Sequence, residues 1–173
     1  MIICPYCGGD NIPGVDQCEN CDASLSDLYL AEPATGVEKS LLRDHLPELE
    51  PRTPVTVRPE TTVGDVLNRL VEEEIGCVLV TEGEKLLGIF SERDAINRLG
   101  ANAAELSDRP ISEFMTKDPQ TLPVSAKIAF AVKHMDVGHY RHIPMTDENG
   151  DNVTGIISVR DFLRYLTDRM SPV

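Results

Sequence analysis

One seven-residue pattern occurs twice in this chain. Residues 88–94 read Gly-Ile-Phe-Ser-Glu-Arg-Asp, and residues 155–161 read Gly-Ile-Ile-Ser-Val-Arg-Asp. In each copy an apolar strand end leads to a Ser, which is a favoured helix N-cap, and then to an Arg and an Asp in the first helical turn. The free N–H groups of such a turn suit an anion, and an ionised Asp accepts hydrogen bonds from a sugar diol. The pattern predicts two related strand-to-helix corners that frame a nucleotide pocket.

The segments around the two corners also match, so the pattern belongs to an internal repeat. The matched pairs are 55–59 with 119–123, 62–74 with 125–136, 76–80 with 141–145, 86–90 with 153–157, and 95–99 with 162–166. Helical spacing of apolar residues alternates with short apolar runs, so each copy reads as β-α-β-β-α. The fold class is therefore α/β of the α+β type. Each unit has about fifty residues and needs a neighbour to cover its apolar faces.

This order of elements, with a strand that ends in Gly-Ile-x-Ser-x-x-Asp, resembles a CBS domain. Two copies in tandem resemble a CBS pair, or Bateman module, over residues from about 50 to 168. The run Phe-Met-Thr-Lys-Asp-Pro at 114–119 is the usual start of the second repeat, whereas Pro-Arg-Thr-Pro at 51–54 lacks its Met-Thr signature. We expect repeat 1 at 51–104 and repeat 2 at 105–173.

The resemblance implies an adenosyl ligand in clefts between the repeats: AMP, ADP, ATP or S-adenosylmethionine. In the family the Ser and the Asp of each corner contact phosphate and ribose. The corresponding positions are Ser91, Asp94, Ser158 and Asp161. The alternative is a plain N-cap followed by a carboxylate that complements the helix dipole. In each corner an arginine, Arg93 or Arg160, lies between the Ser and the Asp. Its guanidinium could donate two hydrogen bonds to a phosphate or pair with a surface Glu.

The strand start of the second repeat differs in charge from that of the first. Tyr140, Arg141 and His142 stand where related nucleotide sensors hold basic residues against phosphates. The equivalent positions of the first repeat, Gly76 and Cys77, carry no charge. We therefore expect two unequal sites, with adenine near Ile75 and Tyr140 and phosphate favoured where Arg141 and His142 contribute. The alternative for these residues is a solvated strand start.

Four of the five cysteines form two C-x-x-C pairs near the N-terminus, in a stretch with too little apolar mass to fold unaided. They are Cys4, Cys7, Cys18 and Cys21. Four thiolates at this spacing close a tetrahedral Zn²⁺ site, and metal binding supplies the folding free energy. This resembles a zinc ribbon at 1–24, and four Cys ligands leave no open position for catalysis. The alternatives, a redox dithiol or rubredoxin-like iron, fit the spacing less well. The remaining Cys77 is interpreted as a small buried apolar residue.

Residues 25–50 are interpreted as a connector, with short helices at 23–30 and 38–46, the second packed on the following domain. The chain carries a net charge of −13, and no Lys or Arg precedes Lys39. Nucleic-acid binding through the ribbon is therefore disfavoured. No apolar run approaches the length of a membrane span, and a signal-peptide profile is lacking, so we expect a cytoplasmic protein without membrane contact.

No catalytic constellation is present, since the corner serines lack a neighbouring His and carboxylate. We expect a regulatory, ligand-sensing module without enzymatic activity, which couples adenosyl-ligand binding to a protein partner or to its oligomeric state. The resemblance also implies a homodimer. The alternative is a ligand-free scaffold whose repeats dimerise and whose zinc ribbon docks a protein partner.

Overall fold

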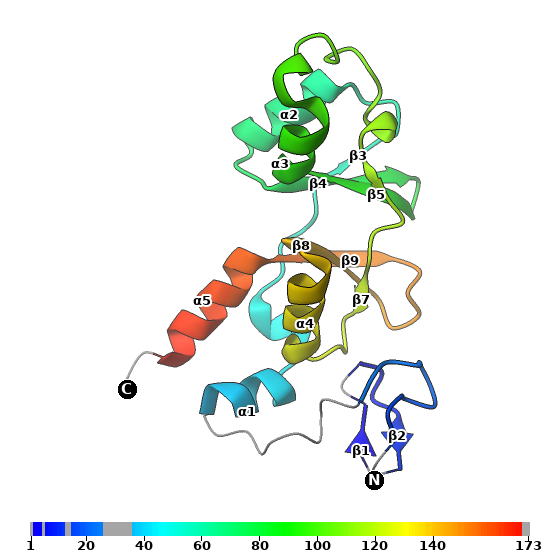
Figure 1. Ribbon diagram of the computed structural model, residues 1–173, viewed down its shortest axis with the longest axis vertical. Helices are drawn as coiled ribbons and strands as arrows, with labels where there is room; N and C mark the ends of the chain where they lie inside the picture. Colours follow the sequence, from blue (N-terminus) through cyan, green and yellow to red (C-terminus); the bar gives the residue numbers. More distant parts are fainter. Residues whose placement is uncertain (1, 5, 13–14, 26–35, 171–173) are drawn as a thin grey trace.

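The computed structural model describes residues 2–4, 6–12, 15–25 and 36–170. The two repeats are stacked with their sheets toward each other and their helices outside (Figure 1). The predicted helix at 23–30 lies mostly outside the described residues. Within the described part, no helix is both long and apolar enough to cross a membrane.

Repeat 1 follows the predicted order of elements. They are β3 (Thr56–Val57), α2 (Val63–Glu72), β4 (Cys77–Glu82), β5 (Lys85–Ser91), α3 (Glu92–Asp94), a π-helical turn η3 (Ala95–Leu99) and a 3₁₀ turn η4 (Gly100–Asn102). Thr62 caps α2 by accepting a hydrogen bond from the Asp65 N–H at 3.2 Å. Val71 of α2 is 78% exposed.

Repeat 2 has the same order and a more regular last helix. Its elements are β7 (Leu122–Pro123), α4 (Ile128–Gly138), β8 (His142–Thr146), β9 (Val153–Ser158) and α5 (Val159–Met170). Both hairpins carry an irregularity at the same place, after Val80 and after Met145. The first strands pair Val57 with Val80 and Leu122 with Met145, so the predicted match of 55–59 with 119–123 is displaced by one residue. A two-residue strand holds too little pattern to fix its register.

The central strands are buried on both faces, which explains their continuous apolar sequence. In β4 and β5, Val78, Val80 and Phe90 point into the core beneath the repeat's own helices. The alternate residues form a second cluster with Val153 and Ile156 of repeat 2. This cluster comprises Cys77, Leu79 and Ile89, and it joins the two sheets.

Each sheet is completed by the segment that leads into the other repeat. After η5 (Ile111–Glu113), strand β6 (Thr116–Lys117) precedes repeat 2 but pairs with β5 of repeat 1. Correspondingly, Arg52 precedes repeat 1 but bridges to Ile156 in β9, with reciprocal N–H···O distances of 3.2 and 3.0 Å. The two repeats are therefore joined by backbone hydrogen bonds as well as by side-chain packing.

The glycine of each seven-residue pattern allows the segment from the other side of the repeat boundary to pair with the sheet at close range. A Cβ atom on Gly88 would lie 2.8 Å from the carbonyl oxygen of Thr116, too close for any side chain. A Cβ atom on Gly155 would meet Pro51 at 3.2 Å, a tighter contact than most. The two glycines thus serve the close approach of a neighbouring segment.

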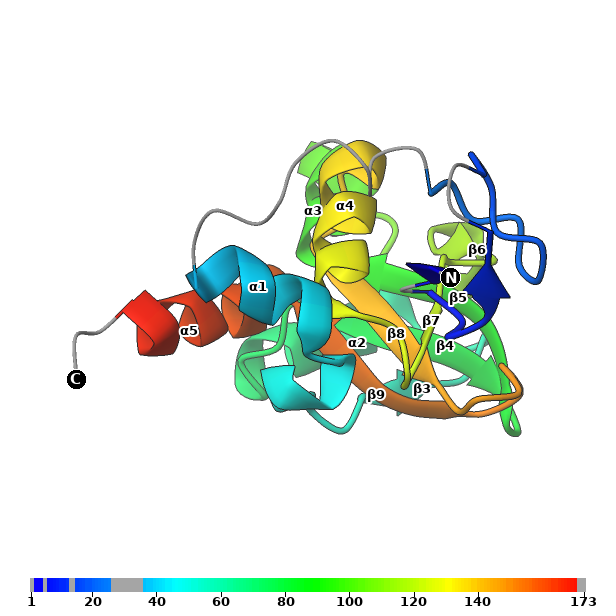
Figure 2. The ribbon, with the colours of Figure 1, turned by 90° about the horizontal axis from the view of Figure 1, so that it is seen from below.

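The connector packs on repeat 2, against α4 and α5 (Figures 1 and 2). Its helix α1 (Gly36–Arg43) ends before the predicted Leu46, because His45 is extended and bridges to Lys127. Leu46 then begins the 3₁₀ helix η2 (Leu46–Leu49). Leu46 is fully buried and Leu49 is 2% exposed, both in the core of repeat 2. The prediction that this segment packs on the following domain is confirmed.

The N-terminal ribbon consists of β1 (Ile2–Ile3), β2 (Asp10–Asn11) and two cysteine turns, and it lies against α4 on the side away from α1 (Figure 2). The ring of Tyr6 packs on the ring of Phe130 in α4, with centroids 5.0 Å apart. The ribbon is thereby docked on repeat 2 by a residue from one of its own Cys-x-x-Cys turns.

Candidate functional site

Both corners form capping boxes. In the first, the Ser91 Oγ accepts a hydrogen bond from the Asp94 N–H at 3.3 Å, and Asp94 Oδ2 accepts from the Ser91 N–H and Oγ at 3.0 and 2.6 Å. In the second, Ser158 and Asp161 repeat this arrangement at 3.4, 2.8 and 2.7 Å. The predicted N-cap role of both serines is confirmed, and each Asp turns back to stabilise its own helix start.

The two corner carboxylates differ in access. Asp161 is only 2% exposed, and its Oδ1 accepts from Arg164 at 3.2 Å. The side chain of Asp94 is 17% exposed, with Arg98 Nε 3.3 Å from its Oδ1. A carboxylate has about four lone-pair positions, so Asp161, with three partners, can still accept a further bond. Asp94 also accepts from Thr116 Oγ1 at 3.2 Å, so a ligand hydroxyl would replace that contact. Asp94 is the more accessible of the two.

The first corner opens into a cleft of about 260 Å³, here called the first-corner cleft. Its walls come from both repeats, because the strand start of repeat 2 lies opposite the corner of repeat 1. The predicted ligand residues that line it are Gly76, Ser91, Arg93, Asp94, Tyr140, Arg141 and His142. Residues that the sequence prediction did not include are Ile89, Glu92, Asn97, Thr116 and His139.

The second corner opens into a related cleft of about 160 Å³, here called the second-corner cleft. The predicted ligand residues that line it are Ile75, Gly76, Arg141, His142, Ser158, Arg160 and Asp161. The prediction missed Arg52, Thr53, Val55, Glu74, Cys77, Glu92, Ile156 and Val159. Ile75 and Tyr140, both expected near adenine, line different clefts, whereas Arg141 and His142 line both.

His142 sits where the two clefts meet and fills the space left by Gly76. A Cβ atom on Gly76 would lie 2.6 Å from His142 Nε2, so a side chain there would displace the imidazole. Burial lowers the pKa of His142, while Glu92 and Asp161 act to raise it and Arg141 acts to lower it further. The ring is therefore neutral near pH 7 and offers one donor and one acceptor.

Arg93 bonds to a backbone carbonyl rather than to a surface Glu. Its Nη1 donates to the carbonyl oxygen of His139 at 3.0 Å. His139 ends α4 in the left-handed conformation, with φ of 54°. Arg93 therefore holds the corner of repeat 1 to the end of a repeat 2 helix, across the first-corner cleft.

Cys77 lines the second-corner cleft but is not poised for reaction. It is 7% exposed, and burial, together with the charges of Glu92 and Asp94, raises the pKa of its thiol to about 12. A neutral thiol is a poor nucleophile. Its interpretation as a small buried apolar residue is confirmed.

The four N-terminal cysteines form a cluster whose geometry fits a tetrahedral metal site. Their sulfur atoms all lie within 4.8 Å of one another, and the Cys4–Cys21 and Cys7–Cys18 sulfur distances are 3.7 and 3.6 Å. A tetrahedron with Zn–S bonds of about 2.3 Å has sulfur–sulfur edges of about 3.8 Å. The donor set thus fits a structural ion such as Zn²⁺.

The backbone around this cluster also suits thiolate ligands. Each Cys-x-x-Cys turn is followed by a left-handed residue, Gly8 with φ of 73° and Asp22 with φ of 57°. The Asn20 N–H points at the Cys18 sulfur at 3.4 Å. Burial opposes ionisation of Cys18, but the backbone N–H groups of Asn20 and Cys21 lower its pKa to about 6. Burial raises the pKa of Cys4 and Cys21 instead, so a bound cation is needed to stabilise all four thiolates together.

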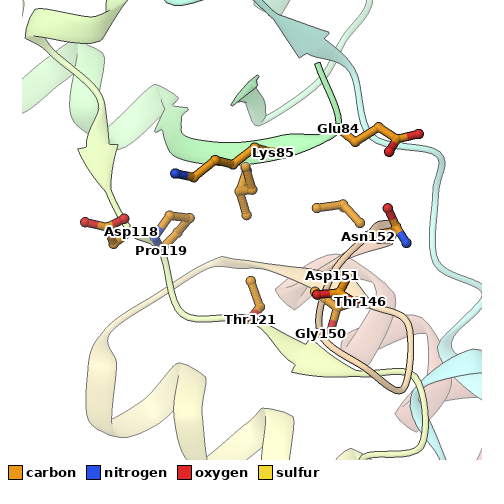
Figure 3. Close-up of a pocket in the computed structure, with 11 residues that line it drawn as sticks. Glu84, Lys85, Asp118, Pro119, Thr121, Thr146, Gly150, Asp151 and Asn152 are labelled. Atoms are coloured by element: carbon orange, nitrogen blue, oxygen red, sulfur yellow. The ribbon is translucent and has the colours of Figure 1, made fainter. Parts of the chain in front are cut away.

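A third hollow, of about 540 Å³, lies at the opposite ends of the sheets from the corners (Figure 3). The turns of the two hairpins and the strand-free stretch before β7 enclose it. Its labelled polar residues include Glu84, Lys85, Asp118, Asp151 and Asn152. None of the predicted ligand residues lines this hollow.

Comparison with known proteins shows which family this architecture belongs to. The CBS domain family model matches residues 48–101 and 111–168. An uncharacterized 17.7 kDa protein of Acidianus ambivalens is 29% identical over 113 residues, which is 65% of this chain and 66% of that protein. A CBS domain-containing protein of Arabidopsis thaliana is 33% identical over 103 residues, or 60% of this chain. The chain spans only 19% of that longer relative.

Solved structures agree with this assignment. The CBS-domain containing protein from Agrobacterium tumefaciens has a TM-score of 0.65 at 29% identity and covers 73% of this chain and 100% of its own. A CBS domain protein from Pyrobaculum aerophilum, complexed with AMP, has a TM-score of 0.61 at 25% identity and covers 72% and 99%. The chain therefore belongs to the CBS domain family and contains a CBS pair, preceded by a ribbon whose four clustered cysteines could hold a metal ion.

Proposed function

We propose that this chain is a non-catalytic regulatory module that binds an adenosyl ligand in the clefts between its CBS repeats. The observation that carries the proposal is the placement of the duplicated corner. Each copy lines a cleft whose opposite wall is the strand start of the other repeat. The related protein from Pyrobaculum aerophilum is complexed with AMP, which supports an adenosyl ligand here.

Each cleft offers an apolar wall and a polar end. In the first-corner cleft, Ile89 and the half-exposed ring of Tyr140 provide surfaces for adenine, and Asp94 can accept from a ribose hydroxyl. In the second-corner cleft, Ile75 and Ile156 take the apolar role. Ligand sites commonly combine such walls with a few convergent polar groups.

A ligand in either cleft touches both repeats, so its binding depends on their mutual arrangement. Differential affinity for one arrangement is what allows a ligand to shift an equilibrium. Because the helices form the outer layers, a change in the angle between the sheets alters the surface that a partner meets. We infer that this is how ligand binding is coupled to a partner or to the oligomeric state.

Calorimetry of the full chain with AMP, ADP, ATP and S-adenosylmethionine tests the proposal. Tyr140→Ala should weaken binding in the first-corner cleft by about tenfold or more, since stacking on an aromatic ring contributes roughly 1–3 kcal/mol per base. Leu42→Ala is the matched control, because Leu42 is 41% exposed against 40% for Tyr140 and lines neither cleft. No heat with any of the four ligands would refute the sensing function.

The cysteine cluster is proposed to hold one structural Zn²⁺ per chain. The sulfur spacing and the N–H groups directed at the thiolates support this assignment. Native mass spectrometry should find one zinc per chain, and Cys18→Ser should lose it together with the protease resistance of the ribbon. Full zinc content in that variant would contradict a four-cysteine site.

A homodimer through the outer helices is also proposed. Large apolar side chains lie exposed on both helical layers. They are Val71, Ile96, Val137, Leu163 and Met170, between 54% and 78% exposed. Burying such a surface against a second copy removes it from water. Light scattering should give a dimer for the wild type and a monomer for Val71→Asp.

The alternative, a scaffold whose ribbon docks a protein partner, has one observation in its favour. Ile3 and Ile12 on the ribbon are each 64% exposed. A double Ile3→Ser, Ile12→Ser variant should lose partner capture in this alternative while any nucleotide response is kept. In the sensing proposal, the Tyr140→Ala variant changes the response and the ribbon variant does not.

A further inference from the structure

We infer that the second-corner cleft is a polyphosphate site, which takes a nucleoside di- or triphosphate in preference to a monophosphate, with Arg52 as a specificity-determining residue. The inference rests on the proposed function and adds to it the ligand class and the cleft. It follows from how the arginines of this chain are partnered.

All eleven arginines lie in the described part of the chain, and eight have an acidic or carbonyl partner. Those eight are Arg43, Arg58, Arg69, Arg93, Arg98, Arg109, Arg164 and Arg169. Within the described residues, no hydrogen bond or ion pair engages the guanidinium groups of Arg52, Arg141 and Arg160. All three line the second-corner cleft. The chain has 29 acidic residues, so a shortage of carboxylates does not explain why these three arginines lack a partner.

These three arginines line the cleft from separate parts of the sequence. Arg52 lies on the segment that bridges to β9, Arg141 precedes β8, and Arg160 is in the first turn of α5. The three arginines are therefore brought together by the fold and do not belong to a basic run in the sequence. The first-corner cleft shares only Arg141 with this set. Its other arginine, Arg93, already donates to the carbonyl of His139.

Charge and geometry together favour more than one phosphate. A guanidinium donates as a planar fork that matches two phosphate oxygens, so three of them suit a chain of phosphates better than a single dianion. Glu74 and Glu92 line the same cleft and oppose a bare anion. Nucleoside polyphosphates carry Mg²⁺, which binds through one or two carboxylates together with phosphate oxygens. The acidic pair is therefore compatible with a magnesium-bound polyphosphate.

The cleft has an open side for the distal phosphates. Its volume of about 160 Å³ is below the roughly 300–1,000 Å³ typical of small-molecule sites, so it cannot enclose a whole nucleotide. It continues into a groove of about 930 Å³ beside α2 and α3. Arg52 and Arg160 line both spaces and so lie at the junction through which a phosphate chain would pass.

Calorimetry of the zinc-loaded full chain with adenosine, AMP, ADP and ATP, in excess Mg²⁺, tests the inference. Affinity should rise from AMP to ATP by about tenfold or more, as expected for added charge-assisted hydrogen bonds. Arg52→Gln should abolish this rise, so that ATP and AMP bind with affinities within about twofold of each other. Arg58→Gln is the control, because Arg58 is exposed, pairs with Glu60 and lines neither of the two corner clefts.

The outcomes separate this inference from the function it rests on. Equal affinities for AMP and ATP, or an ATP preference that survives Arg52→Gln, overturn the polyphosphate assignment while adenosyl binding stands. Absence of binding by these four ligands overturns the polyphosphate assignment, and absence of binding by S-adenosylmethionine as well overturns the sensing function. A preference that is lost in Arg52→Gln and kept in Arg58→Gln supports the assignment.

Discussion

Replacing Asp44 should show how firmly the connector is fastened to repeat 2. The Asp44 carboxylate is 9% exposed and accepts hydrogen bonds from Tyr165 Oη at 2.9 Å, Arg169 Nη2 at 2.8 Å and Arg43 Nε at 3.0 Å. The Tyr165 residue is 3% exposed, so Asp44→Ala leaves its hydroxyl without this partner. An unsatisfied buried polar group costs about 1–3 kcal/mol.

The charged partners add less to this loss. Arg43 is 77% exposed, and an exposed pair contributes about 0–1 kcal/mol. Arg169 is 32% exposed and keeps its stacking on the Tyr165 ring, 3.7 Å from the centroid, after the substitution. We expect Asp44→Ala to lower the free energy of unfolding by about 2–4 kcal/mol, a large part of the roughly 5–15 kcal/mol typical of a domain.

Urea unfolding followed by circular dichroism measures this loss, and a double-mutant cycle with Tyr165→Phe isolates the hydrogen bond. Burial opposes ionisation of Asp44, but the bonds from Tyr165, Arg43 and Arg169 outweigh it and lower the pKa below the ordinary 3.8. A lowered folded-state pKa gives stability that is present above 3.8 and is lost as pH falls below it. The gap between wild type and Asp44→Ala should therefore be widest near neutral pH and narrow below pH 3.8. Strict additivity of the two substitutions would refute the proposed coupling.

Three further predictions concern the glycines, the ribbon and the buried thiol. Gly88→Ala should lower the melting temperature more than Gly155→Ala, because the added methyl meets a backbone carbonyl at 2.8 Å in one case and a proline side chain at 3.2 Å in the other; equal losses would contradict the crossing argument. Tyr6→Ala should make the ribbon sensitive to limited proteolysis while zinc content stays at one per chain, since an aromatic pair contributes about 0.5–1.5 kcal/mol; unchanged protection would mean that this ring does not hold the ribbon. In the zinc-loaded protein, Cys77 should resist iodoacetamide at pH 8, because burial, Glu92 and Asp94 raise the pKa of its thiol to about 12; labelling at the unfolded rate would refute its burial.

The duplicated sequence predicted the fold because each repeat contains its own complete pattern. The helix spacing, the paired turns and the Ser-x-x-Asp corners are local features, and the structure shows them as capping boxes at Ser91 and Ser158. The cysteine cluster was predictable for the same reason, since the spacing of the ligands within each turn is short.

What the sequence did not reveal depends on how the repeats meet. Tyr140 lies across from the first corner and Ile75 across from the second, and only the stacking of the two sheets decides this pairing. Arg52 was missed because it crosses to β9 of the other repeat, about a hundred residues away in sequence. Asp44 was missed because its partners, Tyr165 and Arg169, are brought to it by the same long-range packing.

The reciprocal exchange of edge segments means that neither half of the CBS pair is a self-sufficient building block. Cutting the chain between residues 104 and 111 would remove β6 from the first sheet and leave the second without its bridge to Arg52. Each fragment would then present an unpaired strand to solvent, which invites association with any chain that can supply the missing edge. Mixing the two fragments should restore the assembly, so the molecule is open to reconstitution from pieces that are individually prone to aggregate.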